Sequence, residues 1–347
     1  MTKTAFHDER RSALLLALQE APHRFGFFQA LRLLECADPE RPRLGQTARP
    51  TEEPLRLGQD PSLSFAPSTL AGFASGAPGR PPRMSVFFLG LFGPNGPLPL
   101  HLSEYARDRQ RNAGDPTFAR FADIFHHRIL VLFYRAWANA RPTVSFDRPE
   151  TDRFGVYLGA LFGQGTPALR ARDAMPDLAK RHYAGRLVAQ TRHPEGLAAI
   201  LADFFRVSAR IEEFVGHWLD LPRESQWRLG ASPDTGSLGL TTVVGARVWD
   251  RQYKFRILLG PLGLSDYRRL LPGGESLPKL VAIVRNYLGD ELDWDLNLIL
   301  RREETPPIQL GAQGQLGWTT WLTSRPPVQD PADLKLQPLR FSLSSDG

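Results

Sequence analysis

The stretch Met84–Tyr105, MSVFFLGLFGPNGPLPLHLSEY, organises this chain, because a similar pattern returns at Lys254–Tyr267, KFRILLGPLGLSDY. In each copy an apolar run of strand-forming residues leads to a Gly-Pro pair, Gly93-Pro94 in the first and Gly260-Pro261 in the second. Because proline cannot donate a hydrogen bond to the ladder of a sheet, we expect each strand to end at its Gly-Pro pair. The chain therefore presents a similar loop twice.

A helix is expected to follow each loop. Ser103 and Ser265 stand at the positions of N-caps, and Glu104 and Asp266 lie in the first turn, where the helix dipole favours negative charge. The two segments then form two similar strand, loop and helix units. Either an internal duplication or a chance similarity of two short segments explains them.

Leucines lie on both loops, between the Gly-Pro pair and the helix. They are Leu98, Leu100 and Leu102 in the first loop, and Leu262 and Leu264 in the second. A loop held by glycine and proline can present leucines as anchors for a partner, or it can pack them on its own domain. The sequence leaves both interpretations open.

The composition is that of a globular protein with a sizeable core: 347 residues, 42% hydrophobic and 23% charged. This length predicts one large domain or two ordinary ones. The formal net charge of +6 permits acidic partners, but the basic residues are scattered. Cys36 is the single cysteine, which excludes an intrachain disulfide and fits a reducing compartment, and we interpret it as a small core residue.

Neither a signal peptide nor a membrane span is predicted. Arg10-Arg11 follow two acidic residues and precede an apolar run that is too short for a leader, so the N-terminus is interpreted as a helix. Met84–Ser103 carries no charged residue and has the length of a span. The glycines and prolines from Gly93 to Pro99 would break the helix that a span needs.

Helices dominate the prediction for the first 206 residues. Two short ones are expected at Ser12–Gln19 and Phe27–Glu35, followed by a proline-rich arm at 38–83 with a short strand at Leu63–Phe65. The arm is interpreted as extended and packed on a domain or a partner, with a partly disordered loop as the alternative. Asp115-Pro116 then opens the longest helix, which ends before Pro142.

That long helix is apolar on nearly every face, which predicts that it is buried or sandwiched between partners. Its candidate contact residues are Phe118, Phe125 and Phe133.

Further short helices are predicted at Arg153–Phe162, Asp177–Gln190 and Pro194–Phe205. The pattern then changes to period two, which predicts an α+β part at 207–325 with a mixed or antiparallel sheet, flanking helices and the second Gly-Pro loop. Its expected elements are a strand at Ile211–Trp218, a hairpin of Thr241–Trp249 with Gln252–Leu259, a helix at Leu277–Leu288, a one-sided strand at Leu292–Leu300 and a strand at Leu316–Leu322. Residues 326–347 are expected to form a loose tail.

Residues arranged for catalysis are scarce. Asp123 and His127 have the spacing of two metal ligands on one helical face, but no third ligand is evident nearby. Glu212-Glu213 and the pair Asp293 and Asp295 are interpreted as solvated strand faces rather than as an acid and base pair. The chain has neither a phosphate-binding loop nor a nucleophile elbow. We therefore expect no enzyme activity, cofactor or metal site.

Four blocks of the sequence resemble one known family. They are RFGFFQALRLLE at 24–35, FLGLFGPNGPLPLHLSEY at 88–105, DPTFARFADIFHHRILVLFYRAW at 115–137 and VGARVWDRQYKFRILLGPLGLSDYRRLLPG at 244–273. In this order, and over about residues 24–322, they are similar to TssG, also called ImpH or VasB, of the type VI secretion system baseplate. The proline-rich arm and the end of the chain carry none of these blocks.

The resemblance implies a cytoplasmic, non-enzymatic subunit of the baseplate wedge, assembled at the cytoplasmic face of the inner membrane through the membrane complex. Such a subunit joins two copies of TssF and holds two TssK trimers, with TssE and the sheath and hub components as neighbours. Our hypothesis is that Gly93–Leu102 and Gly260–Leu264 each insert leucines into a TssK trimer. The helix Thr117–Ala138 would then bind the TssF pair.

Three alternatives stay open. A related structural one is a component of a phage-tail baseplate, because contractile machines share parts. A metal-dependent hydrolase would use Asp123 and His127. A nucleic-acid binder would use the scattered arginines, which lack the interleaved aromatic residues of a stacking platform, so we expect no nucleic-acid partner.

Overall fold

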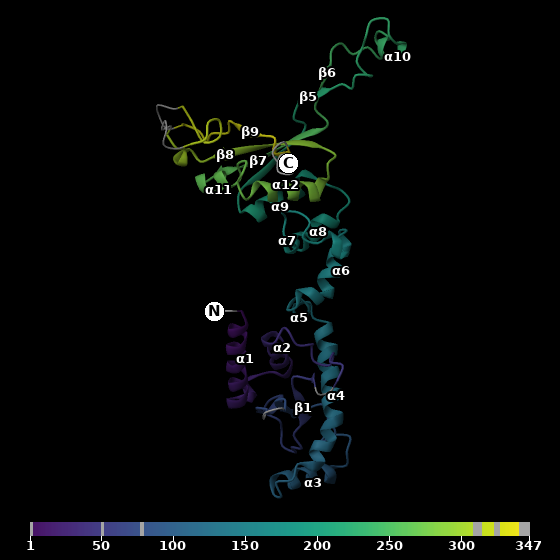
Figure 1. Cartoon of the computed structure of the whole chain (residues 1–347), viewed down its shortest axis with the longest axis vertical. Helices are drawn as coiled ribbons and strands as arrows, with labels where there is room; N and C mark the ends of the chain where they lie inside the picture. The colour runs from purple at the N-terminus through teal and green to yellow at the C-terminus, as the bar shows by residue number, and fades with distance from the viewer. Residues whose placement is uncertain (1–2, 50–51, 77–79, 308–313, 323–326, 340–347) are drawn as a thin grey trace. The chain divides into compact units, whose positions relative to one another are not determined.

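A computed structural model describes residues 3–49, 52–76, 80–307, 314–322 and 327–339 of the chain (Figure 1). The chain divides into two compact units, Met1–Gly155 and Val156–Gly347. Helices and sheets occur in both units, which confirms the predicted α+β class. The predicted domain boundary between residues 206 and 207 lies after the observed one between residues 155 and 156. Helix α9 (Pro194–Phe205) belongs to the second unit, where Tyr287 Oη donates to the carbonyl of His193 at 3.0 Å.

Two helices open the first unit, as the apolar periodicity predicts. They are α1 (Lys3–Glu20) and α2 (Phe27–Ala37), joined by a 3-10 turn at Pro22–Arg24. Phe27, Ala30 and Leu31 bury one face of α2. Cys36 lies off this face and is exposed, so its interpretation as a core residue is wrong. Desolvation and the nearby Asp147 carboxylate raise the pKa of the Cys36 thiol to about 11.

The proline-rich arm supplies much of the core of this unit. It contains β1 (Arg56–Gln59) and β2 (Leu70–Ala74), which flank β3 (Arg83–Val86) in a sheet of order β1-β3-β2. Strand β1 is parallel to β3, and β2 is antiparallel to it. The predicted strand at Leu63–Phe65 is wrong, because prolines flank that segment and Phe65 is 98% exposed.

The first Gly-Pro segment departs from its predicted form. Its strand ends at Val86, well before Gly93, and Phe87–Pro99 forms bends and turns instead. Leu89 (φ 51°) and Gly93 (φ 113°) have positive φ, which an extended strand cannot contain. Instead of joining a ladder, the amides of this segment donate to side chains that lie elsewhere in the unit, as described below.

Helices α3 (Leu100–Arg111), α4 (Thr117–Asn139) and α5 (Pro142–Phe146) complete the unit. Ser103 is not an N-cap, because α3 begins at Leu100. Its buried hydroxyl accepts a hydrogen bond from the backbone of Gly93 at 3.2 Å. Asp115 is not the N-cap of α4 either, because the helix begins at Thr117 and its N-cap is Pro116. Asp115 lies one residue earlier, and its Oδ1 accepts from the Thr117 amide at 3.0 Å.

The second unit is built on a four-stranded sheet of order β4-β7-β8-β9. Its strands are β4 (Ala209–Glu212), β7 (Lys254–Leu262), β8 (Asp293–Leu300) and β9 (Leu334–Leu336). The central pair, β7 and β8, is parallel, and each edge strand is antiparallel to its neighbour. Helix α12 (Leu277–Leu288) forms over the predicted residues and lies with α9 against one face of the sheet (Figure 1).

Four short helices accompany this sheet. They are α6 (Arg153–Leu161), which begins at the end of the first unit, α7 (Asp177–His182), α8 (Ala184–Val188) and α11 (Leu264–Arg269).

The second Gly-Pro pair also departs from its predicted form, in the opposite direction. Strand β7 does not stop at Gly260 but continues through Pro261 to Leu262, with a shift of register between Leu259 and Leu262. Gly260 has φ 139°, and a side chain there would collide with the carbonyl oxygen of Ile299 on β8. Helix α11 begins at Leu264, after Gly263, so Ser265 is not its N-cap.

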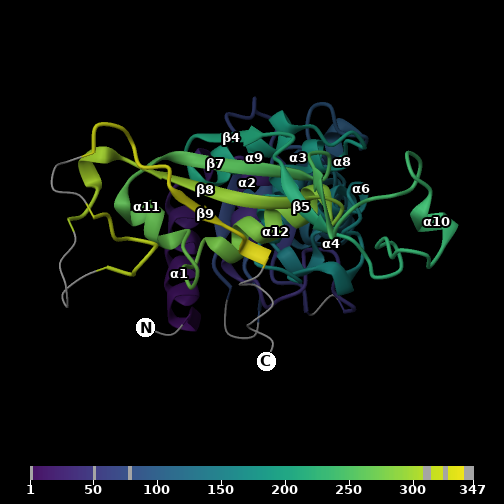
Figure 2. The same cartoon turned by 90° about the horizontal axis from the view of Figure 1, so that it is seen from above.

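A two-stranded ribbon replaces the predicted hairpin. Strands β5 (His217–Asp220) and β6 (Arg247–Asp250) pair with each other, and β6 does not pair with β7. The predicted strand Ile211–Trp218 is split between β4 and β5, because Phe214 has φ 56° and turns the chain. The ribbon, residues 217–250, includes α10 (Pro233–Gly236) and extends away from the sheet in both views (Figures 1 and 2).

The C-terminal predictions need two corrections. Leu316–Leu322 forms turns and one isolated bridge rather than a strand. Part of the predicted loose tail is β9, in which Leu336 is buried. Residue 326 and residues 340–347 of that tail lie outside the described residues.

Successive side chains of strand β8 are buried, so both of its faces are covered and it is not the one-sided strand that was predicted. Asp295 is buried rather than solvated and binds Arg256 Nε at 2.6 Å and Lys254 Nζ at 3.1 Å.

Candidate interaction surfaces

Helix α4 buries several polar residues together with its core residues and leaves large apolar residues exposed. Its buried side includes Asp123, His126, Tyr134 and Arg135. Its exposed side carries an apolar row, which we call the α4 stripe. The α4 stripe consists of Phe121, Ile124, Phe125, Ile129, Leu132 and Phe133. Ile124 is 66% exposed, which is unusual for a large apolar side chain on a helix packed against a domain.

The polar side of α4 binds backbone amides of neighbouring segments. Asp123 Oδ1 accepts from the amide of Gln59 at 3.0 Å, and its Oδ2 pairs with Arg83. His126 Nε2 accepts from the amide of Leu91 at 2.9 Å, so its Nδ1 donates to Asp123 Oδ1 at 3.0 Å. Burial lowers the pKa of His126 to about 4, which keeps the imidazole neutral.

Contacts of this kind also engage Asp123 and His127, the two residues that the sequence offers as metal ligands. Asp123 is engaged as described, and His127 Nδ1 accepts from the amide of Leu57 at 3.1 Å. Within the described ranges, no three His, Cys, Asp or Glu side chains gather to hold a metal ion. The polar atoms of this face therefore fix α4 to β1 and to the first Gly-Pro segment.

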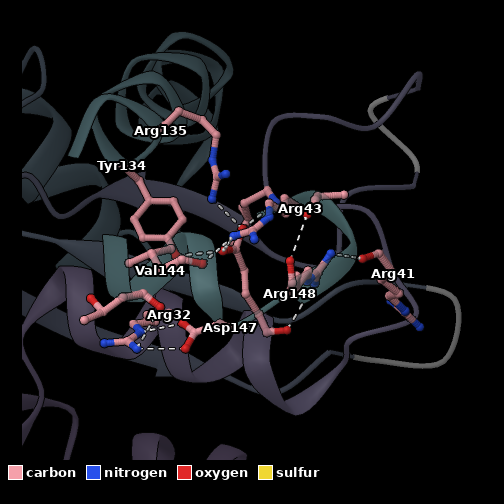
Figure 3. Close-up of polar contacts among 12 residues, drawn as sticks. Arg32, Arg41, Arg43, Tyr134, Arg135, Val144, Asp147 and Arg148 are labelled. Carbon is pink, nitrogen blue, oxygen red and sulfur yellow. Dashed lines mark hydrogen bonds and ion pairs between the residues drawn. The ribbon is translucent and has the colours of Figure 1, made fainter. Parts of the chain in front are cut away.

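A second polar network binds the buried side of α4, and Figure 3 shows Tyr134 and Arg135 of this helix within it. Its central carboxylate is Glu35 of α2. Glu35 Oε1 accepts from Arg135 at 2.6 Å and from the amide of Leu44 at 2.8 Å, and its Oε2 accepts from Tyr134 Oη at 2.9 Å. Burial raises the pKa of the Tyr134 hydroxyl, which therefore remains a donor. Arg43 approaches the same carboxylate at 3.9 Å.

Arg32 and Arg148 extend this network to α5 and the arm. Arg32 binds Asp147 through two hydrogen bonds of 2.6 and 2.8 Å, and Arg148 donates to the carbonyl of Arg41 at 2.7 Å (Figure 3). Sequence reasoning missed the network, because its partners are about a hundred positions apart and no local pattern marks them. Together with Asp123, it determines that the α4 stripe faces outward.

The first Gly-Pro loop, Gly93–Leu102, is fixed at both ends. The amide of Gly96 donates to the carbonyl of Gly93 at 3.1 Å, and Leu98 packs half-buried near Phe92. Phe118, at the start of α4, packs against the ring of Phe92 at 5.7 Å. Leu102 is half-buried, Pro94 is exposed and Leu100 is 52% exposed. Leu100 is thus the leucine that this loop presents.

The second Gly-Pro loop, Gly260–Leu264, is closer to its own core. Leu262 is 1% exposed and pairs with Leu300 across the sheet, so it cannot contact a partner without rearrangement. Pro261 is exposed. Leu264 is half-buried, and its amide donates to Glu304 Oε2 at 2.6 Å. The two loops therefore differ in what they present.

The ribbon carries apolar residues that sequence reasoning did not select. The Trp218 and Trp249 rings lie 5.3 Å apart on its two strands, and both are exposed. Between the strands, Leu229, Leu238, Leu240 and Val244 are all strongly exposed. We call these four residues the ribbon tip. Their setting among glycine, serine, threonine and proline was the available signal, because such a segment cannot bury them locally.

The α4 stripe, the first Gly-Pro loop and the ribbon tip give the chain prominent exposed apolar surfaces, a feature typical of proteins that assemble with partners. Among the helices within the described ranges, none has the length and apolar character that crossing a membrane requires.

Comparison with known families identifies residues 21–323 with the model "Type VI secretion, TssG". The chain belongs to the TssG family of type VI secretion proteins, which confirms the resemblance seen in its four sequence blocks. A comparison with curated proteins finds no match.

Two solved structures are similar to the chain. One is described as the baseplate complex from the type VI secretion system. The likeness has 25% identity and a TM-score of 0.66, and it covers 95% of this chain and 94% of that one. The other is a TssK-TssF-TssG baseplate subcomplex revealed by cryo-electron microscopy, with 24% identity and a TM-score of 0.47 over 60% of this chain and 85% of that one.

Proposed function

We propose that this chain is a non-catalytic structural subunit of the type VI secretion baseplate wedge. It bridges two copies of TssF and docks two TssK trimers in the cytoplasm, near TssE and the sheath and hub components. The membrane complex holds the assembly at the cytoplasmic face of the inner membrane. Membership of the TssG family supports this proposal, as does the likeness to a baseplate complex over nearly the whole chain.

The observation that carries the proposal is the outward-facing α4 stripe. Phe121 and Phe125 form an edge-to-face pair with ring centroids 6.0 Å apart, and Ile124 and Leu132 extend the apolar surface along the helix. Large apolar anchors at an interface typically carry about 2 kcal/mol or more each. We assign this surface to the TssF pair, because helices of a partner can lie lengthwise against it.

The two Gly-Pro loops are the proposed docking points for the two TssK trimers. Leu100 and Pro94 would enter one trimer, and Pro261 with Leu264 the other. Leu98, Leu102 and the buried Leu262 would support the two loops from inside. Two docking points on one subunit increase the effective concentration of the second contact after the first has formed.

The ribbon tip is an alternative TssK docking site. Leu238 is 93% exposed, more than any leucine of either Gly-Pro loop, and the ribbon carries it away from the sheet.

Two rival functions have less support. A hydrolase would need Asp123 and His127, whose polar atoms bind Arg83 and backbone amides instead. A component of a phage-tail baseplate would fit the same apolar surfaces, but the family model favours the secretion system.

Native mass spectrometry of the chain co-expressed with TssF and TssK tests the proposal. Phe125→Asp should lose TssF, whereas Leu100→Asp and Leu264→Asp should each lose one TssK trimer and keep TssF. Leu238→Ser/Leu240→Ser is the matched variant for the ribbon tip. If the loop variants keep both trimers and the ribbon variant loses one, docking belongs to the ribbon. If Phe125→Asp retains both TssF copies, the assignment of the α4 stripe is wrong.

A further inference from the structure

A hollow of about 500 Å³ opens beside the α4 stripe within the first unit. Residues of the arm, of β1 and β3 and of α4 line it. Four of them are arginines, Arg56, Arg83, Arg120 and Arg128, and we call the site the arginine hollow. Ile124 belongs to both the arginine hollow and the α4 stripe, so the two are continuous.

The charges in the arginine hollow do not balance. Its carboxylates are Glu53 and Asp123, so four guanidinium groups face two negative charges and leave an excess of two positive charges. His127 adds no charge at neutral pH, because burial lowers its pKa. The site is therefore positive although it opens onto an apolar surface.

Both carboxylates already have partners within the fold, although the buried Oε2 of Glu53 has none among the described residues. Glu53 Oε1 accepts from the amide of Gly45 at 3.0 Å and from Thr47 Oγ1 at 2.8 Å. Asp123 pairs closely with Arg83 and reaches Arg120 only at 3.6 Å. Neither carboxylate is positioned to neutralise all the guanidinium groups around it.

Two of the arginines are incompletely paired. Arg83 Nε is buried and has no hydrogen-bond partner among the described residues. Desolvation lowers the pKa of Arg120, as expected for a partly buried guanidinium whose nearest carboxylate is distant. Arg120, whose side chain is 49% exposed, remains accessible to an acceptor from outside the chain.

We propose that the arginine hollow receives a carboxylate side chain from the partner helix that lies along the α4 stripe. This inference rests on the proposed function, because it specifies the chemistry of the partner at the same surface. Guanidinium groups match carboxylates through paired, charge-assisted hydrogen bonds, and a desolvated pair of this kind is among the stronger contacts of an interface.

The carboxylate would determine the register of the partner helix. An apolar row such as Phe121, Phe125, Leu132 allows a helix to slide by one turn with little change in buried area. A single acid that must enter the arginine hollow removes that freedom, since any other register leaves a buried charge unpaired.

The dissociation rate of the co-expressed complex with TssF, followed by exchange with labelled TssF, tests whether the arginine hollow strengthens binding. Arg128→Glu and the milder Arg120→Gln/Arg128→Gln should raise the dissociation rate, by at least about tenfold for the charge reversal. Arg24→Gln, at an exposed arginine of the same unit outside both surfaces, is the matched control and should leave the rate unchanged.

A zero-length carbodiimide cross-link tests the chemistry directly. Arg128→Lys keeps the charge and supplies an amine that can form an amide bond only with a carboxylate in direct contact. We expect one dominant cross-link to an Asp or Glu of TssF, absent from the Arg24→Lys control. No cross-link above the control, or an unchanged dissociation rate for Arg128→Glu, would overturn the inference.

The proposed function and the proposed role of the arginine hollow can fail separately. If Phe125→Asp releases TssF while the arginine variants behave as wild type, the proposed function stands and this inference falls. If Phe125→Asp leaves the complex intact, the surface does not bind TssF and both fall. Faster dissociation of Arg128→Glu without a cross-link would mean that the arginines act only at long range, which also overturns the proposal.

Discussion

The two Gly-Pro segments share a sequence pattern but differ in structure. In the first, the strand ends at Val86 and the chain reaches Gly93 through bends whose amides bind side chains of other segments. In the second, β7 runs through Gly260 and Pro261 and ends in the core at Leu262. The same short pattern therefore forms an exposed loop in one unit and part of a sheet in the other. The segments that pack against each copy determine which conformation it adopts.

The largest contrast is expected for a charge at one leucine of each segment. Leu262→Asp would bury an unpaired carboxylate in the core and lower the free energy of unfolding by about 4 kcal/mol. Leu100→Asp, at an exposed position, should change it by less than about 0.5 kcal/mol. Urea unfolding followed by circular dichroism measures both. Equal losses would mean that the two loops are equally buried.

A smaller contrast is expected at the glycines. In Gly260→Ala the new methyl group meets the Ile299 carbonyl at a positive φ, so we expect a loss of about 3 kcal/mol. Gly93→Ala shares the positive φ, but its methyl group meets only the Ser62 carbonyl oxygen at an ordinary contact distance of 3.8 Å, so about 1 kcal/mol is expected. Thermal unfolding of the two variants, each compared with wild type, gives the order. A larger loss for Gly93→Ala would contradict the placement of β7.

Acid should weaken the first segment next, because a buried histidine holds it. His126 binds the amide of Leu91, and burial lowers its pKa from 6.5 to about 4. Between these values the unfolded chain binds more protons than the folded one, so stability falls as the pH falls.

We expect the titration of His126 to lower the free energy of unfolding of the first unit by about 2 kcal/mol between pH 6.5 and pH 4. Urea unfolding at a series of pH values measures it, with His126→Asn as the variant that lacks the titrating group. A slope that is the same in wild type and His126→Asn would show that His126 is not the source.

The smallest contrast concerns the two serines. Ser103→Ala removes the hydrogen bond to the Gly93 amide and should cost about 1 kcal/mol. Ser265 is exposed and is not a cap, so Ser265→Ala should have almost no effect. Chemical unfolding of both variants under the same conditions compares them, and a larger effect at Ser265 would restore the two-fold similarity that the sequence suggested.

Local patterns predicted the helices well and the pairing of strands poorly. Helix α12 forms over the predicted Leu277–Leu288, because its apolar spacing and its burial are both local properties of that segment. The pairing of β6 with β5 rather than with β7 depends on the turn at Phe214 and on neighbours distant in sequence. Strand β9 was missed because it is short and lies in a proline-rich setting.

The candidate surfaces were predicted in outline only. The apolar character of α4 was visible in the sequence, but which face is exposed depends on Asp123, His126 and Glu35, whose partners come from β1, the first Gly-Pro segment and the arm. Burial of Leu262 likewise depends on β8, which follows it in the chain. A sequence alone reports which residues can dock, whereas the packing decides which of them do.

The α4 stripe also affects the fate of the subunit before it binds its partners. A newly made subunit displays aromatic and aliphatic residues of the kind that chaperones and proteases use to recognise unfinished proteins. We expect molecules that find no partner to be cleared, and those that do to be protected by the same side chains. In that case the cell would need no separate device to match the amount of this subunit to the number of machines that it builds.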